Sequence, residues 1–129
     1  MTGIPEDRLY TEEHEWALNA DGIVIVGITD HAQDALGDIT YVELPDAGDE
    51  LTLNQGFGEV ESNKSVSQLF APIGGEVIEV NGDLEDAPET LNDDPYGEGW
   101  LIKIAPTDPN ELQSLMTHEE YSQFIEDAD

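Results

Sequence analysis

The sequence contains no cysteine and almost no basic residues. Without cysteine, the chain cannot form a disulfide framework, a cysteine metal site or a cysteine nucleophile. Lysine and arginine together number 3, against 31 aspartate and glutamate residues, and the formal net charge is −28. Such a chain has no basic surface with which to neutralise phosphates or anionic lipids. Its charge therefore argues against nucleic acid and against membrane surfaces as partners.

Long apolar runs are also missing. No segment approaches the roughly 18 apolar residues that a membrane span needs. The acidic N-terminal stretch MTGIPEDRLYTEEHEW has neither the cationic nor the apolar region of a signal peptide. We therefore expect a cytoplasmic protein. With 129 residues, 38% of them hydrophobic, residues 1–129 are expected to form one globular domain with a modest core.

The acidic residues are spread along the chain and do not form a single acidic tail. At low ionic strength these carboxylates repel one another and oppose the compact state. Salt shortens the Debye length to roughly 3 Å at 1 M and so removes most of this repulsion. We interpret the charge as an adaptation to a salty cytoplasm, and the alternative is an ordinary acidic protein with a basic partner. The same charge disfavours self-association, so we expect a monomer.

The hydrophobic pattern predicts a mainly β protein. The β-branched run at residues 22–28 is typical of a buried strand, and the alternation at residues 38–45 predicts another. Further strands are expected within residues 48–62, 65–72, 74–82 and 100–106. A Pro-x-x-Gly spacing occurs twice, at Pro45 and at Pro72, each time after a predicted strand. This repetition suggests a pseudo-symmetric sandwich.

Short helices interrupt and follow the strands. Thr29 or Asp30 can cap a helix that stops near Gly37. Residues 84–100 are dense in proline, glycine, asparagine and aspartate, which predicts turns and loops with a little helix near Glu89.

The C-terminal part of the sequence changes to a helical period. Asp108 can cap one helix, with Pro109 at its first position. Thr117 and Glu120 form a capping box that begins a second helix. We expect these two helices to form a C-terminal pair packed on the β body through their apolar stripes.

Lys64 is one of two lysines in the chain, and it stands in the stretch GFGEVESNKSVSQLFAPIGGEV, residues 56–77. A two-residue loop at Asn63 and Lys64 would place Val60 opposite Ser67 in a hairpin. Small polar residues surround the lysine, so we expect it to be exposed at the hairpin tip. An exposed turn lysine is ordinary in most proteins, but surface lysine is almost absent from this one.

Lys64 could be a solvated turn residue, a catalytic amine or a covalent attachment point. A catalytic lysine needs desolvation or a neighbouring cation to become a neutral nucleophile. An exposed tip beside Glu59 and Glu61 instead favours the charged ammonium. An attachment point needs only an accessible lysine held at a fixed place, and a hairpin tip provides this.

The Lys64 stretch resembles the lipoylation segment of the glycine cleavage system H-protein family, whose pattern places G-x-V-E-S-x-K before a second conserved run ending in G-x-V-x-E-V-N. Three other stretches resemble family signatures in the family order: EEHEW at 12–16, residues 26–45 with TDHAQDALGDI and YVELP, and NDDPYGEGWLIKI at 92–104. Biotinyl domains instead carry methionines beside their lysine. Lipoyl domains of 2-oxoacid dehydrogenases share the lysine turn but lack HEW and TDHAQ. The chain therefore resembles an acidic, halophile-like version of the H protein over nearly its whole length.

The resemblance implies a barrel-sandwich hybrid fold with short helices and lipoate bound covalently to Lys64. It also implies a carrier protein rather than an enzyme. Such a carrier takes the aminomethyl group of glycine from the decarboxylating glycine dehydrogenase to the aminomethyltransferase, and is reoxidised by dihydrolipoamide dehydrogenase. A lipoate ligase or lipoyl transferase would attach the cofactor. Because the redox sulfurs belong to the cofactor, this role in glycine catabolism and one-carbon metabolism agrees with the absence of cysteine.

The family shelters the loaded arm in a surface cleft to which an acidic residue near the N-terminus contributes, and Glu15 is the matching position. The alternative for Glu15 is an ordinary surface carboxylate. Many members have a second acid four residues after the lysine, where this chain has the uncharged Gln68. His14, His31 and His118 are too scattered in the sequence to suggest a metal site.

Two alternatives to glycine cleavage stay open. One is an H-like protein that relays lipoate to other complexes. The other is an acidic interaction module in which Lys64 is unmodified.

Overall fold

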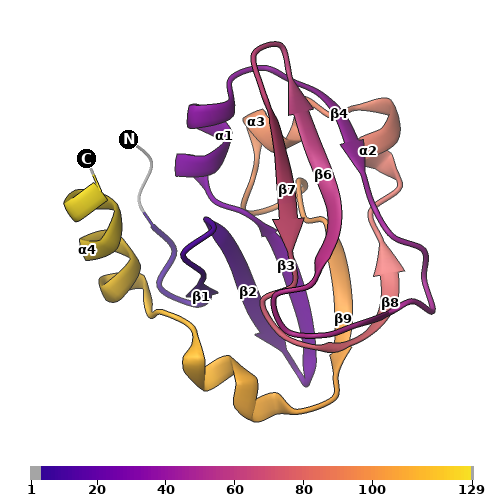
Figure 1. Cartoon of the computed structure of the whole chain (residues 1–129), viewed down its shortest axis with the longest axis vertical. Helices are drawn as coiled ribbons and strands as arrows, with labels where there is room; N and C mark the ends of the chain where they lie inside the picture. Colours follow the sequence, from indigo (N-terminus) through magenta and orange to yellow (C-terminus); the bar gives the residue numbers. More distant parts are fainter. Residues whose placement is uncertain (1–3, 129) are drawn as a thin grey trace.

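A computed structural model describes residues 4–128, which form two antiparallel sheets with short helices around them (Figure 1). The larger sheet has the strand order β1 (Leu9–Tyr10), β2 (Glu15–Ala20), β3 (Ile23–Ile28), β9 (Ile102–Pro106), β8 (Gly75–Val80) and β5 (Glu50–Leu51). The smaller sheet has the order β4 (Ile39–Glu43), β6 (Gly56–Ser62) and β7 (Val66–Phe70). The prediction of a mainly β fold is confirmed.

Apolar side chains from both sheets form one core. Val24 and Val26 of β3 and Ile104 of β9 pack with Val60 of β6 and Leu69 of β7, and all are buried. Successive side chains of a strand point to opposite faces of its sheet. The same alternation therefore buries Val42 of β4 and exposes its neighbours on the outer face.

The two Pro-x-x-Gly stretches lie side by side. The strands that follow them, β5 and β8, are paired, with Leu51 opposite Gly75. Gly48 has a φ of 101°, a conformation that glycine adopts readily. Gly75 lies so close to β9 that a Cβ would be 2.3 Å from the carbonyl oxygen of Ala105. Both glycines are therefore required by the backbone path.

Helix α1 (Asp30–Leu36) follows β3 directly. Thr29 is its N-cap, because the Thr29 hydroxyl oxygen accepts a hydrogen bond of 3.2 Å from the N–H of Ala32. Gly37 ends the helix with φ 84° and ψ −156°. Of the two predicted caps, the threonine is the one used.

The predicted loop at residues 84–100 contains one-turn helices at both sides of Pro88. They are α2 (Asp83–Asp86) and α3 (Thr90–Asp93), and each buries one leucine, Leu84 and Leu91 respectively. The helix expected near Glu89 is α3. The sequence pattern did not indicate α2, because a single turn has no measurable period and Leu84 is held by tertiary packing.

The C-terminal pair consists of a 3-10 helix, η1 (Pro109–Ser114), and an α-helix, α4 (His118–Ala128). The capping box of α4 is formed in both directions: the Thr117 N–H donates to Glu120 Oε1 at 2.9 Å, and the Glu120 N–H donates to Thr117 Oγ1 at 3.2 Å. Asp108 caps η1 by accepting from the N–H of Asn110. The pair is confirmed, with the first member tighter than an α-helix.

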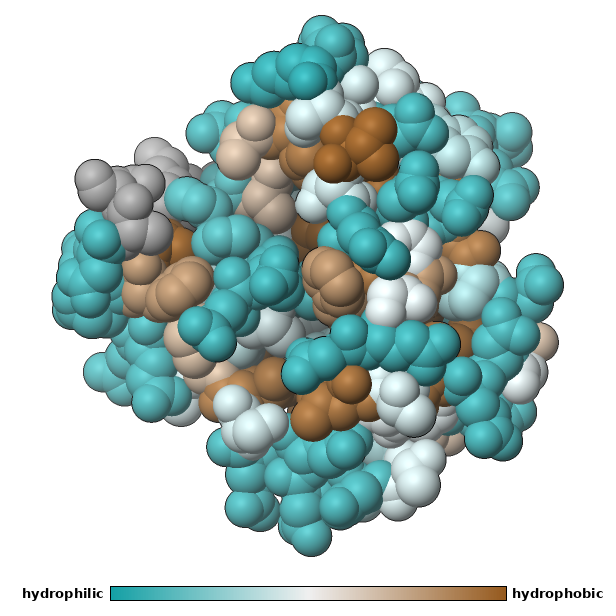
Figure 2. Space-filling view, viewed as in Figure 1, coloured by the Kyte–Doolittle hydropathy of each residue, from teal (hydrophilic) through white to brown (hydrophobic). Residues whose placement is uncertain are grey.

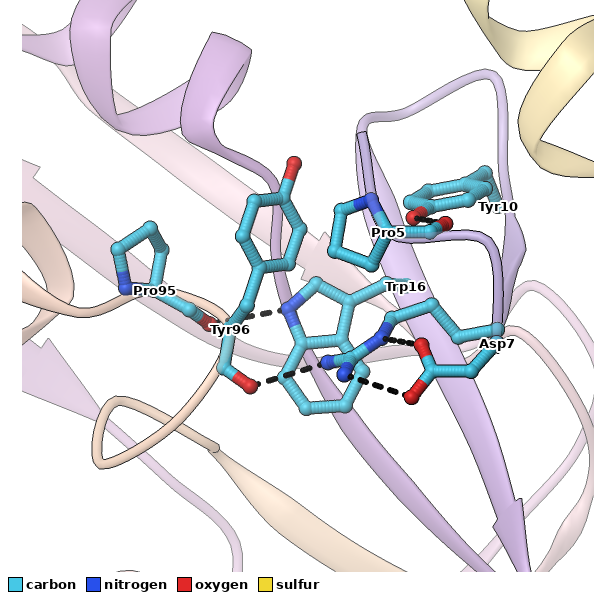
Figure 3. Close-up of polar contacts among 7 residues, drawn as sticks. Pro5, Asp7, Tyr10, Trp16, Pro95 and Tyr96 are labelled. Carbon is cyan, nitrogen blue, oxygen red and sulfur yellow. Dashed lines mark hydrogen bonds and ion pairs between the residues drawn. The ribbon is translucent and has the colours of Figure 1, made fainter. Parts of the chain in front are cut away.

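A second apolar cluster joins α4 to the N-terminal strands. The rings of Tyr10 and Tyr121 stack with centroids 4.7 Å apart. Trp16 donates from its indole nitrogen to the carbonyl of Pro95 at 3.0 Å (Figure 3). The guanidinium of Arg8 lies 4.6 Å from the centre of the Trp16 ring.

Among residues 4–128, no helix is both long and apolar enough to cross a membrane.

Candidate functional site

Lys64 lies at the tip of the hairpin formed by β6 and β7. The pairing of Val60 with Ser67 is the predicted one. Ser62 organises the turn: its N–H donates to the carbonyl of Ser65 at 2.8 Å, and its Oγ accepts from the N–H groups of Lys64 and Ser65. Positive φ values occur at neither Asn63 nor Lys64, so the turn is not type I′. The Oγ of Ser62 also donates to the carbonyl of Ser65 at 3.3 Å, so the lysine sits on a turn held by four hydrogen bonds of one serine.

The amino group of Lys64 is free in a chain crowded with carboxylates. Arg8 is paired with Asp7, and Lys103 lies 3.2 Å from Glu79. Within residues 4–128, none of the ion pairs includes Lys64. The side chain is exposed, and its amine is accessible to a modifying enzyme.

The hairpin tip rests on the connection between α1 and β4, and Figure 1 shows these segments close together at one end of the molecule. The N–H of Asn63 donates to the carbonyl of Asp38 at 3.2 Å. A Cβ on Gly37 would lie 3.0 Å from Cε of Lys64. Glycine at this position therefore leaves the space along which the lysine side chain lies, and an attached group could continue from it.

Glu15, the first residue of β2, is buried, with 1% of its surface exposed. Its Oε2 accepts a 2.7 Å hydrogen bond from the N–H of Phe70, and its Oε1 accepts one of 3.2 Å from the hydroxyl of Thr11. Burial raises the pKa of Glu15 to about 8, although both hydrogen bonds act in the opposite direction. The interpretation of Glu15 as an ordinary surface carboxylate is therefore wrong.

A cleft of about 380 Å³ opens beside Glu15. Its walls come from the turn before β2, the segment between β5 and β6, and the segment between η1 and α4. The lining residues are Tyr10, Thr11, Glu12, Glu13, Glu15, Leu53, Asn54, Ser114, Leu115 and Met116. The cleft combines polar and apolar walls with one buried carboxyl group whose pKa is raised to about 8.

Gln68 lies in the middle of β7. The lysine turn precedes this strand, and its last residue, Phe70, is hydrogen-bonded to Glu15. Gln68 pairs with Glu59 of β6, and its side chain is exposed. The side-chain amide covers Gly56, where a Cβ would be 2.2 Å from Nε2 of Gln68. Strand β7 therefore connects the three predicted site residues. Lys64 precedes the strand, Gln68 lies in its middle, and Glu15 is hydrogen-bonded to the N–H of its last residue, Phe70.

Two histidines that are distant in the sequence meet beside Glu15. The rings of His14 and His31 have centroids 4.6 Å apart. The hydroxyl of Tyr121 lies 2.8 Å from Nδ1 of His14 and 2.8 Å from Oγ1 of Thr29. Burial lowers the pKa of His14, and His31 lowers it further. The fold brings this pair together by placing the turn before β2 against α1, although the two histidines lie far apart in the sequence.

Comparison with known proteins places the chain in a family. The profile described as "Glycine cleavage H-protein" matches residues 8–128. The chain belongs to the glycine cleavage H-protein family. The family is the carrier component of the glycine cleavage system and is not one of its enzymes, which confirms the resemblance seen in the sequence.

Similar H proteins come from organisms of several kinds. The glycine cleavage system H protein of Anaeromyxobacter sp. (strain K) is 57% identical over 126 residues, with 98% of each chain covered. A probable H protein of Natronomonas pharaonis is 55% identical over 122 residues, covering 95% of this chain and 96% of that one. A crystal structure of an H protein from Mycobacterium marinum has a TM-score of 0.86 and 44% identity, covering 93% of this chain and 97% of that chain. This similarity confirms the fold predicted from the sequence.

Sequence reasoning missed two side chains that hold the site together. Tyr121 falls within the second predicted C-terminal helix, for which only an apolar stripe was expected, and its hydroxyl joins α4 to His14 and Thr29. Asn92 lies in a signature stretch, and its amide bonds three residues around the end of α1. In the sequence, each of these two residues is only a polar side chain within a segment that is expected to pack. Such a pattern does not indicate which residue the side chain bonds to.

Proposed function

We propose that this chain is the lipoyl carrier of the glycine cleavage system, with lipoate attached through an amide to Nζ of Lys64. The placement of Lys64 carries the proposal: it is exposed at the tip of a hydrogen-bonded hairpin and takes part in none of the ion pairs among residues 4–128. Membership of the H-protein family supports it. Residues 1–129 are then a single lipoyl-carrier domain that works as a monomer in the cytoplasm.

The residues around Lys64 fit a covalently bound arm. Ser62 fixes the turn, and the absence of a side chain at Gly37 leaves a path beside the lysine. When bound, the lipoyl group supplies the disulfide and dithiol chemistry that a chain without cysteine lacks.

Glu15 is proposed to hold the amine end of the cargo in the cleft beside it. A buried carboxyl group with a pKa of about 8 gains most from a cationic partner, because an opposite charge nearby favours its ionised form. Gln68 offers an uncharged amide oxygen further along the same path. It therefore contributes a hydrogen bond without the attraction that a carboxylate would add.

The carrier visits three enzymes in turn: the decarboxylating glycine dehydrogenase, the aminomethyltransferase and dihydrolipoamide dehydrogenase. It moves the aminomethyl group of glycine from the first to the second and delivers reducing equivalents to the third. Tethering the cargo to a protein replaces diffusion of a small molecule with local encounters at high effective concentration. A lipoate ligase or lipoyl transferase would modify Lys64 beforehand.

The attachment is tested by incubating the full chain with lipoate ligase, ATP and lipoate, and then measuring its intact mass and that of the peptide containing residue 64. We expect one lipoyl group on Lys64 and none in Lys64→Arg, with the melting temperature of that variant unchanged within about 2 °C because an exposed substitution alters stability little. The matched control, Lys103→Arg, should still be modified. A wild-type chain that gains no mass would contradict the proposal.

The role in glycine cleavage is tested separately on the lipoylated chain. With the decarboxylating dehydrogenase and glycine present, we expect a new free thiol on the carrier, measured with a thiol reagent, and none when glycine is omitted. A lipoylated chain that gives no glycine-dependent thiol would support the relay of lipoate to other complexes instead.

A further inference from the structure

The side-chain amide of Asn92 in α3 forms hydrogen bonds through both its oxygen and its nitrogen. Its partners lie in helix α1 and in residues 37–39, which follow that helix. Its Oδ1 accepts a 2.9 Å hydrogen bond from the N–H of Ile39. Its Nδ2 donates to the carbonyl of Gly37 at 2.8 Å and to Oε1 of Gln33 at 2.9 Å. One half-buried amide thus ties together the last turn of α1, the connection at residues 37–39 and the start of β4.

That connection is the surface on which the hairpin tip rests. The carbonyl of Asp38, between the two backbone partners of Asn92, accepts the N–H of Asn63, the residue before the lysine. A Cβ on Gly37 would lie 3.0 Å from Cε and 3.7 Å from Cδ of Lys64. The φ of 84° and ψ of −156° at Gly37 belong to a region that is essentially restricted to glycine. The lysine side chain therefore lies over a backbone segment whose shape depends on Asn92.

We propose that Asn92 is a positioning residue for Lys64. By holding residues 37–39, it fixes the surface beneath the lysine and so the direction in which the side chain leaves the hairpin. Its effect on the attachment of lipoate rests on the function proposed above, whereas its effect on the hairpin tip does not. A modifying enzyme that binds a flexible hairpin tip has to order the tip, and the free energy of this ordering reduces its affinity. A tip that is already ordered avoids this cost.

The effect on the tip is tested by amide hydrogen exchange in the unmodified full chain, measured by NMR in concentrated KCl. In Asn92→Ala we expect the Asn63 amide to exchange about tenfold faster relative to Val60, since the loss of buried hydrogen bonds allows local opening. Asn81→Ala is the matched control. Asn81 is buried and donates to the carbonyls of Glu98 at 2.9 Å and Trp100 at 2.7 Å, so its removal also breaks amide hydrogen bonds.

A second variant covers the case in which Asn92→Ala fails to fold. Asn92→Asp keeps the size of the side chain and the oxygen that accepts from Ile39, but it loses both N–H donors. It should keep the circular dichroism spectrum of the wild type and still accelerate exchange at Asn63. Equal exchange at Asn63 in the wild type, the Asn92 variants and Asn81→Ala would overturn the proposal.

The consequence for attachment is tested with lipoate ligase and varied concentrations of each chain. We expect kcat/KM to fall about tenfold for both Asn92 variants, mainly through KM, and to stay within about twofold for Asn81→Ala. Faster exchange at Asn63 with unchanged attachment kinetics would overturn the claim that Asn92 directs the lysine. A wild-type chain that accepts no lipoate would contradict the proposed function instead, and the exchange results would still decide whether Asn92 holds the tip.

Discussion

The three cationic side chains have three different environments. Arg8 lies over Trp16 and donates to the carbonyl of Tyr96, and Lys103 is paired with Glu79. These two cations stabilise the packing around them, whereas Lys64 lies over the bare backbone of Gly37. Lysine is rare in this chain, and the fold distinguishes Lys64, which takes part in none of the ion pairs among residues 4–128, from the paired Lys103.

Glu15→Gln is predicted to change how stability depends on pH. Because the pKa of Glu15 is raised to about 8 in the folded chain and is ordinary in the unfolded one, the folded state holds this proton more tightly. The contribution of the protonated Glu15 carboxyl to folding stability is complete at pH values below its pKa in the unfolded chain. This contribution is lost as pH rises through its pKa in the folded chain. The stability of the wild type relative to Glu15→Gln should therefore fall from about pH 5 to pH 8, at up to about 1.4 kcal/mol per pH unit.

This dependence is measured by urea unfolding at several pH values and constant KCl concentration. Glu126→Gln, on the exposed face of α4, controls for the removal of one negative charge far from the cleft. A difference between the wild type and Glu15→Gln that stays constant from pH 5 to pH 8 would show that the buried carboxyl does not hold its proton in this range.

At the scale of secondary-structure elements, the C-terminal helix is part of the scaffold of the site. Tyr121 of α4 stacks on Tyr10 of β1 and bonds to Thr29, the cap of α1. The same hydroxyl bonds to His14, which has a φ of 67° in the turn directly before Glu15. A non-glycine residue in this conformation needs support from its surroundings. Helix α4 therefore stabilises both the turn that precedes Glu15 and the start of helix α1, whose C-terminal end lies beneath Lys64.

Tyr121→Phe should lower the free energy of unfolding by about 1–3 kcal/mol, since it leaves Thr29 and His14 without a shared partner in a buried place. Denaturant unfolding measures this loss, and limited proteolysis should show earlier cleavage near α4. Tyr41→Phe is the control, because Tyr41 is 48% exposed on the outer face of β4. Equal stability of the two variants would contradict a structural role for the Tyr121 hydroxyl.

At the scale of the whole molecule, the net charge of −28 lies almost entirely on the surface. Figure 2 shows hydrophilic side chains over most of the visible face, with smaller apolar patches between them. Among the acidic residues that the structure describes, Glu15 is the exception, as it is buried. Within residues 4–128, only two acidic residues take part in ion pairs, so the remaining carboxylates mainly repel one another.

The melting temperature should rise with KCl concentration through the molar range, because salt screens this repulsion between exposed carboxylates. Differential scanning calorimetry at increasing KCl measures the effect. Sucrose, which strengthens burial without screening charge, serves as the control and should raise the melting temperature less than KCl does. A flat or falling melting temperature in KCl would contradict adaptation to salt.

The sequence by itself determined the family, the β class, the cap at Thr117, and the hairpin with Lys64 at its tip, and it narrowed the cap of the first helix to Thr29 or Asp30. These features depend on residues close together in the chain: a period of two, a capping box, or a polar turn between apolar strands. The short strand β1 and the strand β2 escaped prediction, because their pairing with the rest of the sheet is set by tertiary contacts as much as by local pattern.

Only the tertiary structure decided how the site is assembled. The bonds from Phe70 to Glu15 and from Asn92 to Gly37 each join residues 55 positions apart, and the bond between His14 and Tyr121 spans 107. No local pattern specifies such partners, and a pKa of about 8 exists only because the fold takes the Glu15 carboxyl out of water. The exposed lysine at the hairpin tip is therefore readable from the sequence, whereas the buried carboxyl and the surface beneath the lysine are products of packing.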